Sequence, residues 1–256
     1  MTSSELITVS VNIGAALLEN GAEIYRVEES ISRICFAYGA TEANVYAVPT
    51  AIITSFVRDG AQPVTRVRRI HHRGTNLGKL DQLNSLCREI CSSPMDYRKI
   101  DSRIAEIAGS CTFPNHYLCL ATGGIGFFFT LLFHGSLFEA VSAFGIGIIL
   151  WLIHSGMQRL RFNGLFIHII SAAWVSLAAV CCYRLRFIPT YSNVIIGSIM
   201  FLVPGLPITN AIRDLVAGDV MAGISKFAEA LLVAAGIAVG VALPLSILTL
   251  LGGLYG

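Results

Sequence analysis

The residues with the clearest chemical potential follow two prolines inside an apolar region. The segment reads VPGLPITNAIRDL, from Val203 to Leu215. Pro204 and Pro207 each remove a backbone donor and crowd the preceding turn, so an unbroken membrane helix cannot run through them. In lipid, freed backbone groups are tolerated where protein buries them or where they line a wet cavity. The pattern fits a substrate site at a broken transmembrane helix, and equally a proline kink that leads into a cytoplasmic loop.

The polar residues after these prolines are candidate substrate and ion contacts. Asp214 is the first choice for a functional acid, because ionisable groups at membrane depth are costly and usually lie on an ion or substrate path. The alternative is an ion pair with the adjacent Arg213 at the cytoplasmic interface. Asn210 and Thr209 offer hydrogen bonds to a carboxylate or a hydroxyl, or simply cap a helix end. The predicted substrate and ion pathway comprises Pro204, Gly205, Pro207, Thr209, Asn210, Asp214 and Glu229.

Other titratable groups lie in or near the apolar segments. Glu229 lies near the start of the last apolar segment, where it is a candidate for proton coupling or an interfacial residue. His134, His154 and His168 titrate near neutrality, and we expect most of them to be structural.

The composition is that of a membrane protein with two unlike parts. Of the 256 residues, 54% are hydrophobic and 13% charged, with a mean hydropathy of +0.68, whereas a soluble domain carries about 25% charged residues. Residues 1–116 hold twelve of the eighteen Lys and Arg and twelve of the sixteen Asp and Glu. We predict a cytoplasmic α+β domain over 1–116 and a transmembrane domain over 117–256. A secretory signal is not apparent, and the net charge of +2 argues against a nucleic-acid partner.

Four helices are predicted in the first part from apolar residues at three- and four-residue steps. The first ends at Asn20-Gly21, where the left-handed cap conformation is readily adopted. The second runs from about Ile24 to Tyr38, and the third from about Leu77 to Ile90. Ser93-Pro94 predicts the start of the fourth, as an N-cap followed by proline at the first helical position.

A hairpin is predicted between the second and third helices. Residues 43–57 are rich in β-formers, and Asp59-Gly60 predicts a turn that returns the chain through 62–70. Pro49 within the first run indicates an edge position or a bulge. The basic run over 66–73 is either a solvated face near anionic lipid headgroups or a ligand site.

The second part predicts a five-span α-helical bundle, since about 20 apolar residues cross a bilayer. The spans are expected at about 117–135, 137–155, 165–183, 193–210 and 227–251. With the first part inside, sixteen basic residues are cytoplasmic and two are external, which predicts a cytoplasmic N-terminus and an external C-terminus. Many small residues in the spans predict close packing against further helices, from a second chain or from copies of this one.

Metal and enzyme chemistry are not indicated. The seven cysteines show no zinc spacing, and we expect free, buried thiols, no metal and no cofactor. We find no nucleophile, base and stabilising donor that would converge in an intramembrane enzyme, and we predict that the chain is not an enzyme.

Four motifs then carry a family resemblance, since their order and spacing resemble the threonine/serine exporter family over about residues 5–250. The resemblance is closer to the shorter, two-component branch of that family, which includes a bacterial inner-membrane subunit linked to succinate export. The motifs are Gly21-Ala22-Glu23 with Arg26-Val27-Glu28, then Pro49-Thr50, then Arg73-Gly74-Thr75-Asn76-Leu77, and finally Val203–Pro207 with Asn210, Asp214, Gly218 and Gly223.

The resemblance implies a multi-pass protein of the bacterial inner (plasma) membrane that exports small amino acids or dicarboxylates by secondary transport. Fused members carry a second, shorter hydrophobic half, so a separate small multi-span subunit or a homo-oligomer is implied, besides membrane lipid and a small-molecule substrate. Residues that otherwise fit surface ion pairs and turns become candidate gate or regulatory contacts. They are Glu23, Arg26, Glu28, Pro49, Thr50 and Asn76.

A function of a different class stays open beside transport. The sizeable first domain also fits a membrane-anchored sensor or regulatory subunit that binds a ligand and transports nothing.

Overall fold

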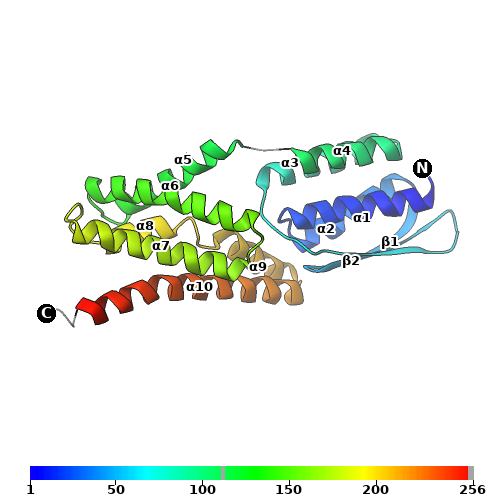
Figure 1. Cartoon of the computed structure of the whole chain (residues 1–256). Coiled ribbons are helices and arrows are strands. Elements are labelled where there is room, and N and C mark those ends of the chain that lie inside the picture. Colours follow the sequence, from blue (N-terminus) through cyan, green and yellow to red (C-terminus); the bar gives the residue numbers. More distant parts are fainter. Residues whose placement is uncertain (111–112, 253–256) are drawn as a thin grey trace. The chain divides into compact units, whose positions relative to one another are not determined.

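The computed structural model describes residues 1–110 and 113–252, which form two compact units (Figure 1). The first unit consists of Met1–Thr112 together with Pro207–Phe227, and the second of Phe113–Leu206 with Ala228–Gly256. The chain therefore leaves the first unit, returns to it for a short segment and leaves it again. Cys111 lies outside the described residues.

The first unit has three layers (Figure 1). An antiparallel sheet of order β1-β2-β3 forms one outer layer. Helices α1 and α2 pack on the sheet, and α3 and α4 pack on these two helices. The elements are α1 (Ser3–Glu19), α2 (Ile24–Ala37), β1 (Ala40–Val48), β2 (Ala51–Arg58), β3 (Val64–Arg69), α3 (Leu77–Ser92) and α4 (Tyr97–Gly109).

The core of the first unit is built around α1. Because this helix lies between the sheet and the outer helices, it is apolar over most of its circumference, and Leu6, Val9 and Ile13 are fully buried. Its start carries a capping box, in which Thr2 and Glu5 exchange side-chain and backbone hydrogen bonds. The first and second helices form as the apolar periodicity predicts.

Two local predictions in this unit were wrong. Pro49 does not lie within one long strand: Pro49-Thr50 is the two-residue turn between β1 and β2, with Val48 opposite Ala51. Proline fixes φ and lacks a donor, so it suits a turn better than a ladder. The fourth helix begins at Tyr97 and not at Ser93-Pro94, where Ser93 caps the end of α3 instead.

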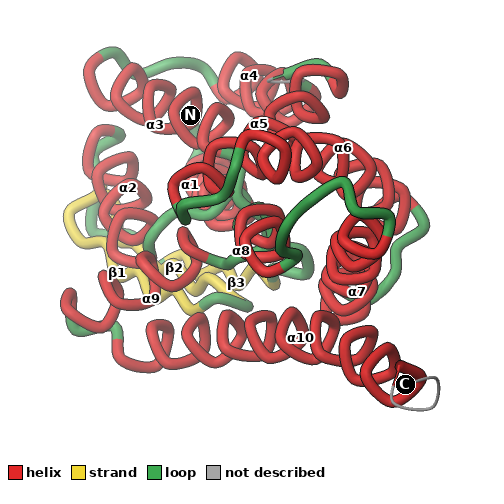
Figure 2. Tube along the Cα trace, turned by 90° about the vertical axis from the view of Figure 1, so that its left-hand side faces the viewer, coloured by secondary structure: helices red, strands yellow, loops and turns green. Residues whose placement is uncertain are grey.

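The second unit is a helical bundle. Its short helix α8 packs against α5, α6 and α7, and lies among them in Figure 2. Glycines allow close contact: a Cβ at Gly126 of α5 would lie 2.8 Å from the Ala143 carbonyl oxygen of α6, and one at Gly240 would lie 2.3 Å from the Ile169 carbonyl oxygen of α7. The helices are α5 (Asn115–Leu132), α6 (Leu137–Arg159), α7 (Gly164–Arg184), α8 (Ser192–Ile199) and the larger part of α10 (Val220–Gly252).

Within the described residues, four helices are long and apolar enough to cross a membrane, namely α5, α6, α7 and α10. The sequence predicts a fifth over 193–210, and there the structure has no continuous helix. Helix α8 ends at Ile199, residues 200–204 are not helical, and α9 (Gly205–Ala217) follows. Pro204 precedes α9, and Pro207 lies in its first turn, where helical N–H groups have no partner in any case. The prolines therefore mark the start of a new helix.

Candidate functional site

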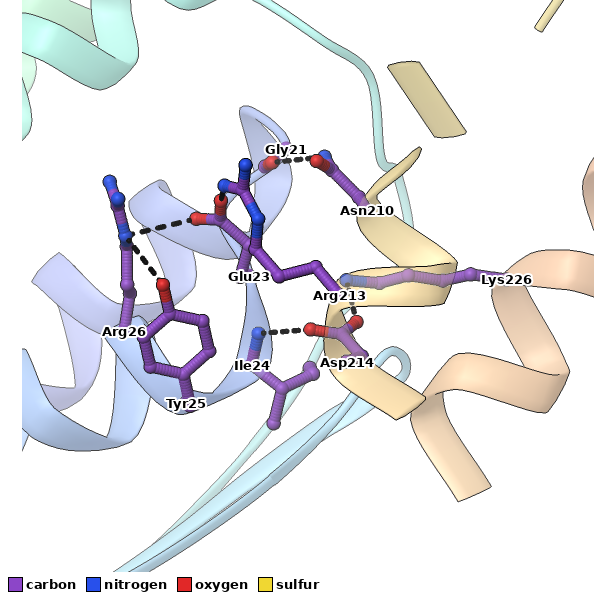
Figure 3. Close-up of polar contacts among 9 residues, drawn as sticks. All are labelled: Gly21, Glu23, Ile24, Tyr25, Arg26, Asn210, Arg213, Asp214 and Lys226. Carbon is purple, nitrogen blue, oxygen red and sulfur yellow. Dashed lines mark hydrogen bonds and ion pairs between the residues drawn. The ribbon is translucent and has the colours of Figure 1, made fainter. Parts of the chain in front are cut away.

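The polar residues of α9 form one face of that helix within the first unit. Asn210, Arg213 and Asp214 are spaced by three and four residues, so their side chains project in the same direction. This face contacts the turn between α1 and α2 and the first residues of α2 (Figure 3). Segments almost two hundred residues apart in the sequence thus meet in one polar cluster.

Asp214 is a fully buried carboxylate with two partners. One oxygen accepts a hydrogen bond of 3.2 Å from the backbone N–H of Ile24, the first residue of α2. That N–H has no partner inside its own helix, and the start of a helix attracts negative charge. The other oxygen lies 2.6 Å from the ammonium of Lys226, whose side chain is also largely buried. Asp214 therefore caps α2 from a distant helix while Lys226 balances its charge.

Glu23 is the second buried carboxylate of the cluster. It is the N-cap residue of α2, but its side chain makes no capping bond. Instead Arg213 donates to one carboxylate oxygen, and Arg26 Nε lies 3.3 Å from the other. Asn210 donates to the Gly21 carbonyl oxygen at 3.2 Å. The side chains of α9 thus bind both the backbone and the carboxylate of the α1–α2 turn (Figure 3).

A tight connection between α9 and α10 places Lys226. Gly218 has a φ of +99°, a conformation that favours glycine, and the N–H of Asp219 donates to the Asp214 carbonyl oxygen at 2.9 Å. The first turns of α10 then pack closely on α9, because a Cβ at Gly223 would lie 2.9 Å from a carbonyl oxygen of α9. This hairpin brings the Lys226 ammonium back to the Asp214 carboxylate.

Two further carboxyls beside the cluster accept protons more readily than usual. Burial raises the pKa of the Glu28 carboxyl; a 2.7 Å hydrogen bond from the Ala47 N–H opposes this, and the charge of Asp219 adds to it. Burial and the charge of Asp214 raise the pKa of Asp219, and Lys226 opposes them. The raised values follow from carboxylates that gather in a partly desolvated place.

Several of the predicted site residues converge on the α1–α2 turn. Besides the contacts of α9, the third motif reaches this turn, because Gly74 N–H donates to the Glu19 carbonyl oxygen and Asn76 N–H to that of Asn20, at 2.9 and 3.1 Å. The Asn76 side chain also caps α3 by accepting from Lys79 N–H at 3.0 Å. Three of the four motifs therefore meet at one turn.

Other predicted residues lie apart from the cluster or at its margin. Pro49 and Thr50 form the β1–β2 turn described above. Thr209 is exposed on α9, and Glu229 is exposed on α10. Pro204, Gly205 and Pro207 define the start of α9.

Lys226 and Asp219 are functional candidates that the sequence analysis missed. The sequence assigns Lys226 no role beyond its place among the basic residues predicted to be cytoplasmic, and it offers Arg213 as the ion-pair partner of Asp214. In the structure Arg213 pairs with Glu23, and Asp214 pairs with Lys226. Gly218 was the available signal, because a turn at this position folds the start of α10 back onto α9.

Comparison with known proteins identifies the family. Residues 8–248 match the family ThrE, described as "Putative threonine/serine exporter". The chain belongs to the threonine/serine exporter family. It is thus a multi-pass membrane protein of a transporter family and not an enzyme, and the resemblance carried by the four motifs is confirmed.

Relatives from several bacteria span nearly the whole chain. A protein of Escherichia coli (strain K12), named "Probable succinate transporter subunit YjjP", is 28% identical over 246 residues, covering 94% of each chain. A Klebsiella aerogenes protein of the same name is 25% identical over 92% of this chain and 91% of its own. A "Probable threonine/serine exporter" of Mycobacterium tuberculosis is 23% identical over 94% of this chain and 46% of its own. No solved structure matches the chain.

Proposed function

We propose that this chain is one subunit of a secondary transporter that exports small amino acids, such as threonine or serine, or dicarboxylates, such as succinate, across the bacterial inner membrane. The observation that carries the proposal is the buried ion pair of Asp214 and Lys226, which follows directly on the interrupted fourth apolar segment. Interrupted helices commonly build the substrate sites of transporters, and this ion pair helps to hold the segment that follows the interruption within the first unit. The names of the relatives supply the substrate classes.

The connectivity of the chain supports five membrane crossings and not four. Both Met1–Thr112 and Pro207–Phe227 belong to the first unit. If α5, α6 and α7 each cross the membrane, the chain must cross once more before Pro207 to return to the side on which it started. Helix α8 and residues 200–204 are the segment available for this crossing. With α10 as the fifth, and with the distribution of basic residues, the first unit is cytoplasmic and the C-terminus external.

The proposed pathway residues have separate roles. Residues 200–204 are not helical, and Pro204, with Gly205 and Pro207 at the start of α9, forms the irregular backbone that would line the substrate path. Thr209 is exposed and offers a hydroxyl, and Glu229 is an exposed carboxylate at the start of the last crossing.

The polar cluster acts as a gate. Asn210 and Asp214 fasten α9 to the α1–α2 turn, where Glu23 and Arg26 form the opposing half of the contact. Release of these bonds frees the segment that follows the interrupted span.

A second small membrane subunit completes the transporter in this proposal. Two relatives are named as subunits of a succinate transporter. The α5–α6 face leaves room for another helix, since a Cβ at Gly124 of α5 would meet nothing within 4 Å. Small residues with open space are what close helix packing requires. Homo-oligomerisation would satisfy the same face.

Efflux measurements test the proposal. Cells preloaded with labelled serine, threonine or succinate would express the chain alone or together with a candidate second membrane subunit. Efflux that needs both chains supports the two-subunit exporter and identifies the substrate. Efflux from this chain alone refutes the need for a partner. If neither arrangement exports any of the three substrates while both proteins are present in the membrane, the proposed function is wrong.

Site variants extend the same measurement to the cluster. Asp214→Asn removes the buried charge but retains an acceptor for the Ile24 N–H, so export should fall while the protein level is maintained. Glu106→Gln on the exposed face of α4 is the control and should leave export unchanged. Unchanged export by Asp214→Asn would remove this residue from the pathway.

A groove in the first unit favours the sensor alternative. It has a volume of about 500 Å³ and lies between α2 and α3, with three guanidinium groups and one carboxylate, that of Glu29, among its charged walls. Such a surface suits a small anion, because arginine binds carboxylates in bidentate fashion. Its walls are Arg26, Glu29, Ser30, Arg33, Asn84, Cys87, Arg88, Cys91 and Ser92. Succinate that stabilises the full chain in lipid nanodiscs, and fails to stabilise Arg88→Met, would support a sensor; no binding would dismiss it.

A further inference from the structure

Two histidines of the membrane-spanning helices face one another. His154 of α6 and His168 of α7 have ring centroids 5.5 Å apart, with the rings inclined at 63°. Both are partly buried within the second unit. Ionisable side chains inside a span are costly, and those that are present commonly bind an ion or carry a proton. A structural histidine needs only one neutral tautomer, whereas a facing pair gives two sites that compete for one proton.

The contacts of His154 describe a neutral ring with one acceptor nitrogen. The amide nitrogen of Gln158 lies 3.0 Å from Nε2 of His154, and an amide nitrogen can only donate. With the amide oriented in this way, Nε2 is an acceptor and the ring is neutral, with its proton on Nδ1 beside the Ser171 hydroxyl at 3.4 Å. Gln158 is exposed, one turn from His154. A proton that arrives at Nε2 is accommodated when the Gln158 amide turns over and presents its oxygen.

The partner ring has a vacant hydrogen-bonding atom. Nδ1 of His168 is buried and finds no hydrogen-bond partner among the described residues, and the same holds for Nε1 of Trp174. His168, Ser171 and Trp174 follow one another at steps of three residues on α7, so a polar stripe runs along a helix that otherwise has the apolarity of a span. Buried polar atoms without partners mark places where a proton, a water molecule or a ligand is missing.

The pair also contacts the interruption after α8. The ring of Phe201 lies edge-on to His154, with centroids 5.4 Å apart. Helix α8 and residues 200–204 contain no ionisable side chain, so His168 is the titratable group that faces His154 across this packing. The Cys119 thiol of α5 donates to the Ile148 carbonyl oxygen at 3.8 Å, and Glu139 of α6 accepts from Thr190. The other ionisable groups on α5, α6, α7 and α10 are His116, Tyr117, Arg159, Cys181, Cys182, Tyr183, Arg184, Lys226 and Glu229.

We propose that His154 and His168 together bind one transported proton and couple its movement to the interrupted segment at Phe201. A proton from the solvent at Gln158 binds to Nε2 of His154, and the resulting cation repels a second proton from His168. Loss of the Gln158 donor bond and the new charge beside Phe201 then alter the packing of residues 200–204. This inference rests on the proposed transport function and assigns the coupling step to a place other than Asp214 or Glu229.

Two measurements on the full chain in lipid test the pair. The first compares proton-gradient-driven transport with substrate exchange at equal pH in reconstituted vesicles. In His154→Gln and in His168→Gln, driven transport should fall by about tenfold, within the range of typical coupling between two sites, while exchange persists. His116→Gln, an exposed histidine at the start of α5, is the control and should retain both activities. A coupling role would be refuted if the two histidine variants lost both driven transport and exchange. It would also be refuted if they kept both activities.

The second measurement does not depend on transport. Labelled histidine side chains are followed by nuclear magnetic resonance in nanodiscs from about pH 4 to 8, the range around the ordinary histidine value. The two rings should bind a single proton between them, and His168→Gln should displace the titration of His154. Independent titrations would overturn the proposal. If the wild type transports nothing, the proposed function fails, and the titration still decides whether the pair binds a shared proton.

Discussion

Replacement of Lys226 by methionine is the change whose effect follows most directly from the structure. Methionine keeps much of the length and apolar contact of the lysine stem but removes the charge. Asp214 is fully buried, and its carboxylate then has no cation at 2.6 Å. Breaking a buried pair by removing one partner costs about 3–5 kcal/mol, because the remaining charge is uncompensated. We expect Lys226→Met to reduce the free energy of unfolding of the first unit by an amount in this range.

The partner variant should cost less, and the two should not be additive. Asp214→Asn still accepts from the Ile24 N–H, and the Lys226 ammonium can move towards water along its flexible stem. Loss of a charge-assisted hydrogen bond is then the main term, about 1.5–3 kcal/mol. The double variant buries no charge, so it should be more stable than Lys226→Met alone. The coupling between the two positions should lie at the upper end of the usual range of about 0.5–3 kcal/mol.

Native-state hydrogen exchange measures the loss of stability in these variants at the start of α2. The amides of the first turn of α2 should lose protection in proportion to the lost stability, since they open with the unit that the pair holds together. Arg33 and Glu29 form a matched control, because their nitrogen–oxygen distance is also 2.6 Å but their side chains are 70% and 52% exposed. Their coupling should be below about 1 kcal/mol. Equal couplings for the buried and the exposed pair would show that burial does not set the strength of the Asp214 contact.

Three further changes have distinct expected outcomes. Asp219→Asn should raise the melting temperature of the first unit near neutral pH, because burial and Asp214 raise the folded-state pKa of this carboxyl. The charged Asp219 destabilises the wild type fully above that pKa, and this destabilisation disappears as the pH falls towards the unfolded value of about 4. A difference in melting temperature between variant and wild type that grows on acidification would contradict the assignment. Gly126→Ala should lower the yield of folded protein in size-exclusion chromatography, since its Cβ would lie 2.8 Å from a carbonyl oxygen of α6, whereas Gly124→Ala on the same helix meets nothing within 4 Å and should be neutral. Asn76→Ala removes the N-cap of α3 and should cost about 1 kcal/mol in thermal unfolding, and a loss below about 0.3 kcal/mol would mean that water replaces the cap.

The helices could be predicted from sequence because their signals are local. Apolar residues at helical spacing locate α1 and α2, and the length of the apolar runs locates α5, α6 and α7. The interruption after α8 was also readable, since prolines exclude a continuous helix at Pro204. The local pattern does not show in which unit the next segment packs. Residues 207–210 belong to the predicted fourth span, but they pack in the first unit with the N-terminal helices.

The site was predicted in part for the same reason. Glu23, Arg26, Asn210 and Asp214 were all singled out, but as two sets with different roles, because their contact depends on a sequence separation of about 190 residues. Lys226 was missed because it lies between the predicted spans at 193–210 and 227–251, in a segment that the sequence predicts to be a loop and that the structure shows as the first turns of α10. Long-range pairing of charges follows from tertiary packing, and no periodicity of the sequence reports it.

The two sets of titratable groups suit different tasks in a transporter. Asp214 and Glu23 are held by cations and by the start of α2. Moving a proton onto either carboxylate would lose a charge-assisted hydrogen bond, at a cost of about 1.5–3 kcal/mol, which favours a role in fastening α9. His154 and His168 have no such cation among the described contacts, and the buried Nδ1 of His168 has no hydrogen-bond partner there. A group that changes charge in every cycle must take up and release its proton without breaking an ion pair, and a facing pair of neutral imidazoles meets this requirement where a locked ion pair does not. The arrangement therefore favours fastening by the carboxylates and proton binding by the histidines.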